Sequence, residues 1–305
     1  MKIVIMGTGG VGGYFGARLA KAGEDVGFVA RGKHLRAIKA KGLQIKSELG
    51  DVLVNSAQAS EKPDDFGIAD IVLFCVKAYD TKVAAQAIKP IIGPGTGVIP
   101  FLNGIGHIQI LKNILGSKSV LGGVANISAL ITEPGVIEHY GPIQTLRVGE
   151  LDDSSSNRLT KFRKACENAK IDAPIPENIE TELWQKVVMI CTLAGANCLT
   201  RLPLGQCRTN SATRQLMTTL ATEVVAVAEA KGISLPKNQV DLTMQLLDNL
   251  PENMKASMLA ALERGDKLEA SALNGTINQL GQEKGIDTPA NRIVYSALAP
   301  HENGI

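Results

Sequence analysis

Short apolar runs alternate with amphipathic stretches through the first half of the chain. Four of these runs are predicted strands, because strands buried on both faces read as near-continuous apolar segments: residues 2–6, 25–30, 71–76 and 97–102. Residues 10–22 between the first two have the apolar spacing of a helix. Strands that alternate with helices predict a parallel, doubly wound sheet. Two later runs, 120–131 and 136–148, are predicted to extend that sheet.

The pattern changes after a predicted helix at residues 158–170. Pro174 and Pro176 interrupt the chain there, and beyond them the apolar spacing is almost entirely helical. Two of the later helices are each predicted to end at a glycine, as helices commonly do: residues 213–231 before Gly232, and residues 266–284 before Gly285.

Length and composition agree with two domains. The chain has 305 residues, of which 45% are hydrophobic and 20% charged, and this excludes a disordered chain, collagen and a coiled-coil rod. We therefore predict an α/β protein with two parts. Residues 1–174 are expected to form a Rossmann-type, doubly wound parallel sheet, and residues 175–305 an all-α domain. A net charge of +2 and only 4% aromatic residues give no sign of a nucleic-acid partner.

The cysteines indicate a reducing compartment. There are five of them without a Cys-x-x-Cys pair, and the four histidines lack metal-ligand spacing, so we expect reduced thiols and no metal site. The opening apolar run is too short for a signal peptide, and no stretch approaches the roughly 18 apolar residues of a membrane span. We expect a cytoplasmic protein without membrane contact, and the apolar helical half allows a homodimer.

The strongest chemical signal is a glycine-rich loop between the first predicted strand and helix. It reads Gly7-Thr8-Gly9-Gly10-Val11-Gly12, which is G-x-G-x-x-G, and in this strand–loop–helix context the pattern indicates dinucleotide binding. Gly7 allows the tight turn, Gly9 lets the backbone approach a pyrophosphate, and Gly12 lets the helix pack on the strand. The start of the helix offers N–H groups to the phosphates.

Arg31 indicates which dinucleotide binds. An NAD site usually has an acidic side chain after the second strand, about 20 residues beyond the loop, to hold the ribose hydroxyls. This chain has Arg31 there, and a guanidinium can bind a 2′-phosphate through two parallel hydrogen bonds. We therefore predict NADP as the cofactor. The alternative is a solvated Arg31 and an enzyme that also uses NADH.

Further motifs in both halves of the chain resemble those of one enzyme family. They are Gly12-Gly13-Tyr14-Phe15-Gly16-Ala17-Arg18-Leu19, Val29-Ala30-Arg31-Gly32, Cys75-Val76-Lys77-Ala78, Leu102-Asn103-Gly104-Ile105-Gly106, Leu183-Trp184-Gln185-Lys186 and Leu273-Asn274-Gly275. Together with the glycine loop they resemble the ketopantoate reductases (2-dehydropantoate 2-reductases) over the whole chain. The resemblance implies NADPH-dependent reduction of a 2-keto acid to a 2-hydroxy acid, most simply 2-dehydropantoate to pantoate in pantothenate biosynthesis.

The resemblance also implies roles for single residues. Lys186 matches the family's catalytic lysine, which also contacts the substrate. Lys77 and Asn103 match cofactor and substrate contacts on the nicotinamide side of the cleft. Ser257 and Glu269 match substrate and cofactor contacts of the helical domain, Ser257 to substrate and Glu269 to cofactor. Glu269 is also expected to take part in catalysis, because it could hold Lys186 or a substrate hydroxyl in place. The chemistry agrees, because hydride attack builds negative charge on the carbonyl oxygen, which a lysine ammonium stabilises and protonates.

The chain departs from the family's pattern after Lys186. The family has three substrate-binding asparagines at spacings of four, eight and eighteen, where this chain has the apolar Ile190, Ala194 and Leu204. Asn197 lies roughly 16 Å along the helix from Lys186 and cannot replace them unless the helix breaks near Gly195. A more apolar 2-keto acid is therefore an alternative substrate.

Two other classes of function stay open on the sequence. One is a non-catalytic NADP-binding sensor, although such a protein has no use for the proton donor Lys186. The other is a β-hydroxyacid, glycerol-phosphate or opine dehydrogenase with the same two-domain plan. The spacing from Lys186 to Leu273-Asn274-Gly275 resembles that of the ketopantoate reductases more closely.

Overall fold

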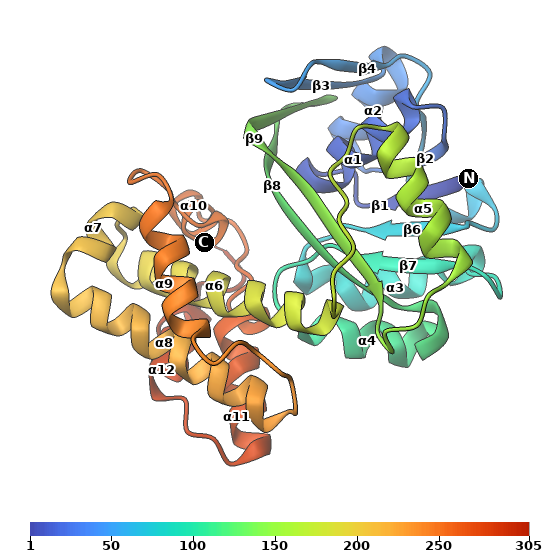
Figure 1. Ribbon diagram of the computed structural model, residues 1–305. Coiled ribbons are helices and arrows are strands. Elements are labelled where there is room, and N and C mark those ends of the chain that lie inside the picture. The colour runs from blue at the N-terminus through green and yellow to red at the C-terminus, as the bar shows by residue number, and fades with distance from the viewer. Residues whose placement is uncertain (305) are drawn as a thin grey trace. The chain divides into compact units, whose positions relative to one another are not determined.

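The computed structural model describes residues 1–304 and divides the chain into two compact units (Figure 1). The first unit comprises Met1–Leu102 and His107–Ile179. The second comprises Asn103–Gly106 and the chain from Glu180 onward. The apolar pattern of the sequence predicts the boundary at residue 174, whereas the division in the structure follows Ile179.

A five-stranded parallel sheet lies at the centre of the first unit. Its order is β5-β2-β1-β6-β7, with β1 (Lys2–Met6), β2 (Asp25–Val29), β5 (Gln58–Ser60), β6 (Ile71–Phe74) and β7 (Gly97–Pro100). The connecting and flanking helices are α1 (Gly10–Lys21), α2 (Gly32–Lys41), α3 (Thr81–Ala87), α4 (Gly106–Leu115) and α5 (Asn157–Asn168). The predicted doubly wound sheet is confirmed. Its strand order changes direction between β1 and β6, the place where such sheets bind ligands.

A second sheet of four strands corrects the prediction for residues 120–148. Its order is β4-β3-β9-β8, with β3 (Leu43–Ser47), β4 (Val52–Val54), β8 (Leu121–Glu133) and β9 (Val136–Glu150). The strands β8 and β9 form a long antiparallel hairpin (Figure 1), and β9 pairs in parallel with β3. They do not extend the first sheet, to which a bridge between Val98 and Val120 connects them. An apolar pattern predicts a strand but not the strand with which it pairs. Here β9 pairs with β3, which lies far earlier in the sequence.

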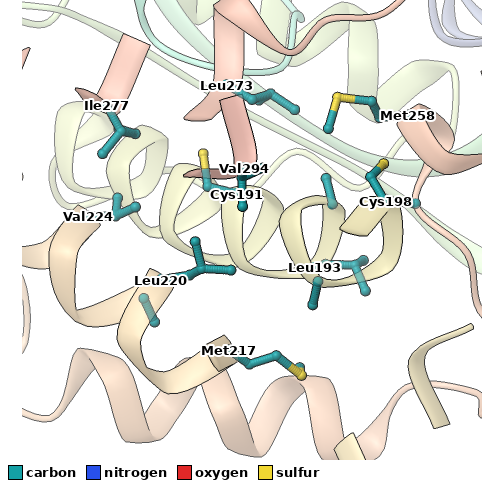
Figure 2. Close-up of a cluster of buried hydrophobic side chains, with 14 of the residues drawn as sticks. Cys191, Leu193, Cys198, Met217, Leu220, Val224, Met258, Leu273, Ile277 and Val294 are labelled. Carbon is teal, nitrogen blue, oxygen red and sulfur yellow. The ribbon is translucent and has the colours of Figure 1, made fainter. Parts of the chain in front are cut away.

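The second unit is all-helical, as predicted. Its helices are α6 (Ile179–Thr200), α7 (Leu204–Thr209), α8 (Ser211–Ala230), α9 (Gln239–Asn249), α10 (Ser257–Arg264), α11 (Thr276–Lys284) and α12 (Pro289–Leu298). Figure 2 shows side chains of α6, such as Leu193, among those of α8, α11 and α12. A Cβ at Gly195 would lie 3.1 Å from the Leu220 side chain and 3.3 Å from that of Val294. Gly195 therefore permits close helix packing, and α6 continues through it without a break.

The predicted helix at residues 266–284 is helical only from Ser271. A short π-helical segment, η5 (Ser271–Gly275), precedes α11. Within it Leu273 has φ −101° and ψ −105°, outside the helical region. The reason lies in the preceding amides: the N–H of Leu268 donates to the Glu302 carbonyl (3.0 Å), and that of Ser271 to Glu302 Oε1 (3.0 Å). These amides bond to the end of the chain instead of to a helix. The predicted stop at Gly285 is confirmed, with φ +70°.

All five cysteines are free thiols. Within residues 1–304, no helix is long and apolar enough to cross a membrane. The same residues contain no group of three or more His, Cys, Asp or Glu side chains that could hold a metal ion.

Candidate functional site

The glycine loop leaves β1 and passes the end of β6. Gly7 has φ +101°, and a Cβ there would lie 2.8 Å from the Cys75 carbonyl oxygen, so the loop requires glycine at this position. A Cβ at Gly12 would lie 2.4 Å from the Gly7 oxygen, which explains the need for glycine where α1 begins to pack on the strand. Both geometries agree with the roles that the sequence analysis gives to these glycines.

Gly9 borders open space at the start of α1. A Cβ there would meet no heavy atom within 4 Å. Gly9 is the N-cap residue, with no side-chain cap, and its carbonyl accepts the Gly13 N–H at 2.8 Å. The N–H groups of the first turn precede this bond and have no partner within the helix. Open space beside such donors fits a pyrophosphate.

The β8–β9 hairpin forms a wall of this site that the sequence analysis missed. A Cβ at Gly10 would lie only 2.0 Å from the Ala129 carbonyl oxygen of β8, so backbone from the second sheet passes directly against the loop. His34 of α2 accepts the Gly135 N–H at 3.0 Å, which fixes the tip of the same hairpin. Two adjacent glycines at 9 and 10 were the only local signal of this close approach.

Arg31 lies two residues after the end of β2 and is the N-cap residue of α2, with an exposed side chain. Thr8 donates both its N–H (3.0 Å) and its hydroxyl (2.9 Å) to the Val29 carbonyl, which holds the glycine loop against the end of β2. The Gly32 N–H donates to Glu61 Oε1 at 3.4 Å. An acidic side chain therefore lies next to Arg31. Glu61 was not predicted from the sequence, because it follows the short polar strand β5, which has no apolar pattern.

Lys77 lies at the same edge of the parallel sheet as the glycine loop. It follows β6, the neighbour of β1, and its side chain is exposed. The Cys75 N–H donates to the Met6 carbonyl at 2.8 Å, so the chain stays beside the loop as it leaves the strand. Burial raises the pKa of the Cys75 thiol, which keeps this neighbour of the loop uncharged.

Lys186 and Glu269 lie close together in the helical unit. Lys186 is a partly buried residue of α6, and Glu269 is 7% exposed in the segment before η5. Burial lowers the pKa of the Lys186 ammonium to about 8, while the Glu269 carboxylate acts in the opposite direction and raises it. A lysine with this pKa is mostly charged at pH 7 and gives up its proton more readily than an ordinary lysine.

The turn Asn103–Gly106 belongs to the same unit. Gly104 has φ +86°, and a Cβ there would lie 2.3 Å from the Ala272 carbonyl oxygen in η5. The partly buried Asn103 is therefore on a turn that contacts the segment just after Glu269. Ser257 is the exposed first residue of α10.

The apolar residues at the family's asparagine positions have different surroundings. Ala194 and Leu204 are 0% exposed in the hydrophobic core, and Leu204 belongs to α7 instead of α6. Ile190 is partly buried and packs against that core. Asn197 is also 0% exposed, with its amide bonded inside the unit. Because α6 is continuous, Asn197 is not brought toward Lys186.

Comparisons with known proteins agree with the fold. The family model for ketopantoate reductase PanE/ApbA matches residues 3–153, and the model for the C-terminal part of the same family matches residues 178–302. A crystal structure of a PanE/ApbA family ketopantoate reductase from Ralstonia eutropha has a TM-score of 0.90 and 31% sequence identity, covering 99% of this chain and 98% of that one.

Two curated relatives extend over the whole chain. A 2-dehydropantoate 2-reductase of Archaeoglobus fulgidus is 31% identical over 305 residues, which cover 100% of this chain and 99% of that protein. An uncharacterized oxidoreductase, YkpB of Bacillus subtilis, is 30% identical over 302 residues, 99% of each chain. Both family models and these relatives show that the chain is an oxidoreductase with a Rossmann-type domain for a nicotinamide cofactor, and that it belongs to the ketopantoate reductase family.

Proposed function

We propose that the protein uses NADPH to reduce a 2-keto acid to a 2-hydroxy acid, with 2-dehydropantoate as the first candidate substrate. The observation that carries this proposal is the position of Lys186 beside Glu269 in a chain of this family. A partly buried lysine next to a carboxylate suits the protonation of a carbonyl oxygen, because it stays charged yet has a lowered pKa.

Four residues of the helical unit share the chemistry. NADPH, when bound, supplies the hydride that reduces the C2 carbonyl. Lys186 binds the carbonyl oxygen, stabilises the negative charge that develops there and gives up a proton from Nζ. Glu269 keeps the lysine charged in its buried surroundings and contacts the cofactor. Ser257 and Asn103 bind the substrate with their polar side chains.

The first unit offers fitting groups for NADP. The open space at Gly9 and the first turn of α1 suit the pyrophosphate, with Thr8 and Val11 completing the loop. The exposed Arg31 suits the 2′-phosphate of the adenosine ribose. Lys77, at the same edge of the sheet, is assigned to the nicotinamide half of the cofactor.

A more apolar 2-keto acid is the second candidate, and the residues after Lys186 favour it. Ala194 and Leu204 lie in the core, and Ile190 lies one turn beyond Lys186. None of the three can form the hydrogen bonds that asparagines provide in the family. A substrate hydroxyl buried without partners costs roughly 1–3 kcal/mol, which would disfavour 2-dehydropantoate.

The test is a panel of 2-keto acids assayed by NADPH oxidation, in which 2-dehydropantoate is compared with aliphatic analogues of similar size. If 2-dehydropantoate has the highest kcat/KM of the panel, the first candidate is supported. A kcat/KM at least tenfold higher for an apolar analogue supports the second. Lys186→Ala is the control for contaminating reductases, and its kcat should be lower than that of the unmodified enzyme by about 100-fold or more. NADPH binding without turnover of any 2-keto acid contradicts the proposal.

A further inference from the structure

Asn197 is a fully buried polar residue of α6 whose side chain bonds entirely within the helical unit. Its Nδ2 donates to the Leu202 carbonyl at 3.0 Å and approaches Cys207 Sγ at 3.7 Å. Its Oδ1 accepts the Ala256 N–H at 2.9 Å. With donor and acceptor both engaged, Asn197 does not bind a substrate itself, so its effect must pass through the groups that it holds.

The bond to Ala256 reaches the residue next to Ser257. Ala256 is 3% exposed and is the N-cap residue of α10, which has no side-chain cap of its own. Ser257 follows it as the exposed first residue of that helix. Helix starts are usually fixed by a capping side chain, and here the contact comes from Oδ1 of a residue far away in the sequence.

Two backbone bonds hold the remainder of the same segment. The Leu204 N–H donates to the Met254 carbonyl at 2.9 Å, and the Gly205 N–H donates to the Glu252 carbonyl at 2.8 Å. These two bonds attach the chain before α10 to the start of α7, and the Asn197 side chain attaches it to α6. Asn197 provides the side-chain contact nearest to Ser257 along this segment.

We propose that Asn197 is a positioning residue that fixes Ser257 relative to Lys186. Both Asn197 and Lys186 belong to the continuous helix α6, about three turns apart, so the helix sets the distance between the lysine and the start of α10. Loss of the Asn197–Ala256 bond lets Ser257 move and weakens substrate binding, while Lys186 keeps its own surroundings. This proposal rests on the proposed function, since Ser257 matters only where a 2-keto acid binds.

The first experiment is a double-mutant cycle in the intact enzyme with the best 2-keto acid from the panel. Asn197→Leu, which has similar volume but no hydrogen bonds, should raise KM about three- to tenfold with NADPH affinity unchanged. Ser257→Ala should raise KM by a similar factor. Because Asn197 acts through Ser257, the double variant should be no worse than the poorer single variant. Effects on KM that multiply, or an unchanged KM in Asn197→Leu, overturn the proposal.

The second experiment does not depend on turnover. Hydrogen exchange at the Ala256 amide should become at least about tenfold faster in Asn197→Leu than in the unmodified protein, because the amide loses its acceptor. Thr192→Val is the matched control: Thr192 is also 0% exposed on α6, but its hydroxyl bonds to Val188 in the same helix. It should leave both KM and this exchange rate unchanged. Unchanged exchange in Asn197→Leu overturns the proposal even where the enzyme assay shows no activity.

A second variant covers the case in which Asn197→Leu does not fold. Asn197→Asp keeps an oxygen that can accept the Ala256 N–H but loses the donor to Leu202. It should retain KM within about threefold of the unmodified enzyme although its stability falls. A KM raised tenfold in a folded Asn197→Asp protein contradicts a role for the Ala256 bond. Absence of turnover in the unmodified protein, with faster exchange in the variants, refutes the proposed function and leaves the anchoring of Ala256 established.

Discussion

The Glu269 carboxylate raises the pKa of Lys186 against the burial that lowers it to about 8. The protonated lysine is the form that can give a proton to the product oxygen. Activity should therefore be present below pH 8 and should be lost as the pH rises through the pKa of Lys186. The midpoint of the alkaline limb of the pH profile therefore reports the pKa of Lys186, and with it the effect of Glu269 on that pKa.

The first prediction is that Glu269→Gln moves this limb to lower pH. Removing the carboxylate removes the interaction that raises the pKa, so burial acts alone and the midpoint falls below that of the unmodified enzyme. The measurement is kcat against pH at saturating NADPH and 2-keto acid. Glu263→Gln is the control, since Glu263 is an exposed residue of α10 that pairs with Lys255. A midpoint that stays in place or rises in Glu269→Gln contradicts the role assigned to this residue.

The second prediction concerns the choice of cofactor. Arg31→Ala should weaken NADPH binding by roughly 10- to 150-fold and leave NADH binding nearly unchanged, because a charge-assisted pair with the 2′-phosphate is lost. Glu61→Gln tests the neighbouring carboxylate, which accepts the Gly32 N–H and should repel the 2′-phosphate. It should tighten NADPH binding and not that of NADH. Titration of the unmodified protein and both variants with both cofactors gives six affinities, and equal affinity of the unmodified protein for both cofactors would refute the assignment of Arg31.

The third prediction separates two adjacent glycines. Gly10→Ala should lower the free energy of unfolding by about 1–3 kcal/mol or more, because the new methyl group meets the Ala129 carbonyl of β8 and backbone cannot easily move away. Gly9→Ala places its methyl group in open space and should change stability by about 1 kcal/mol at most. It should nevertheless weaken NADPH binding, since that space is assigned to the pyrophosphate. Urea unfolding and NADPH titration of both variants check this; equal stability losses would contradict the position of β8 against the loop.

The contrast between these glycines shows what the sequence could predict. The Gly7–Gly12 pattern and the strand before it depend on local geometry, so the loop, the sheet that carries it and the needs of Gly7 and Gly12 were visible in the sequence. The contact of Gly10 with Ala129 depends on the pairing of β9 with β3, which joins distant segments and leaves no periodic signal.

The helical unit shows the same limit. Its helices follow from apolar spacing, but the loss of helix before Ser271 depends on bonds to Glu302 at the other end of the domain. The spacing of Asn197 puts it on the same side of α6 as Lys186 but about three turns away, so the sequence allows it a contact with the substrate only if the helix breaks near Gly195. Only the position of Ala256 shows that its amide is engaged within the unit.

The last prediction concerns the substrate and separates Ile190 from Ala194. Ile190 lies four residues after Lys186 on the same side of α6 and is partly buried. Ile190→Asn should therefore offer an amide near the proposed proton donor and raise the kcat/KM ratio of 2-dehydropantoate to an apolar 2-keto acid, by about threefold to tenfold for one new hydrogen bond.

Ala194→Asn is the matched control, because it introduces the same amide at a position that is 0% exposed in the core. An amide buried there without partners should cost roughly 1–3 kcal/mol of stability, and the substrate ratio should stay unchanged. Kinetics with both substrates and urea unfolding of both variants decide the matter. A substrate ratio that does not change in a folded Ile190→Asn enzyme means that this side of α6 does not contact the substrate beyond Lys186, and selectivity must then come from Ser257 and Asn103.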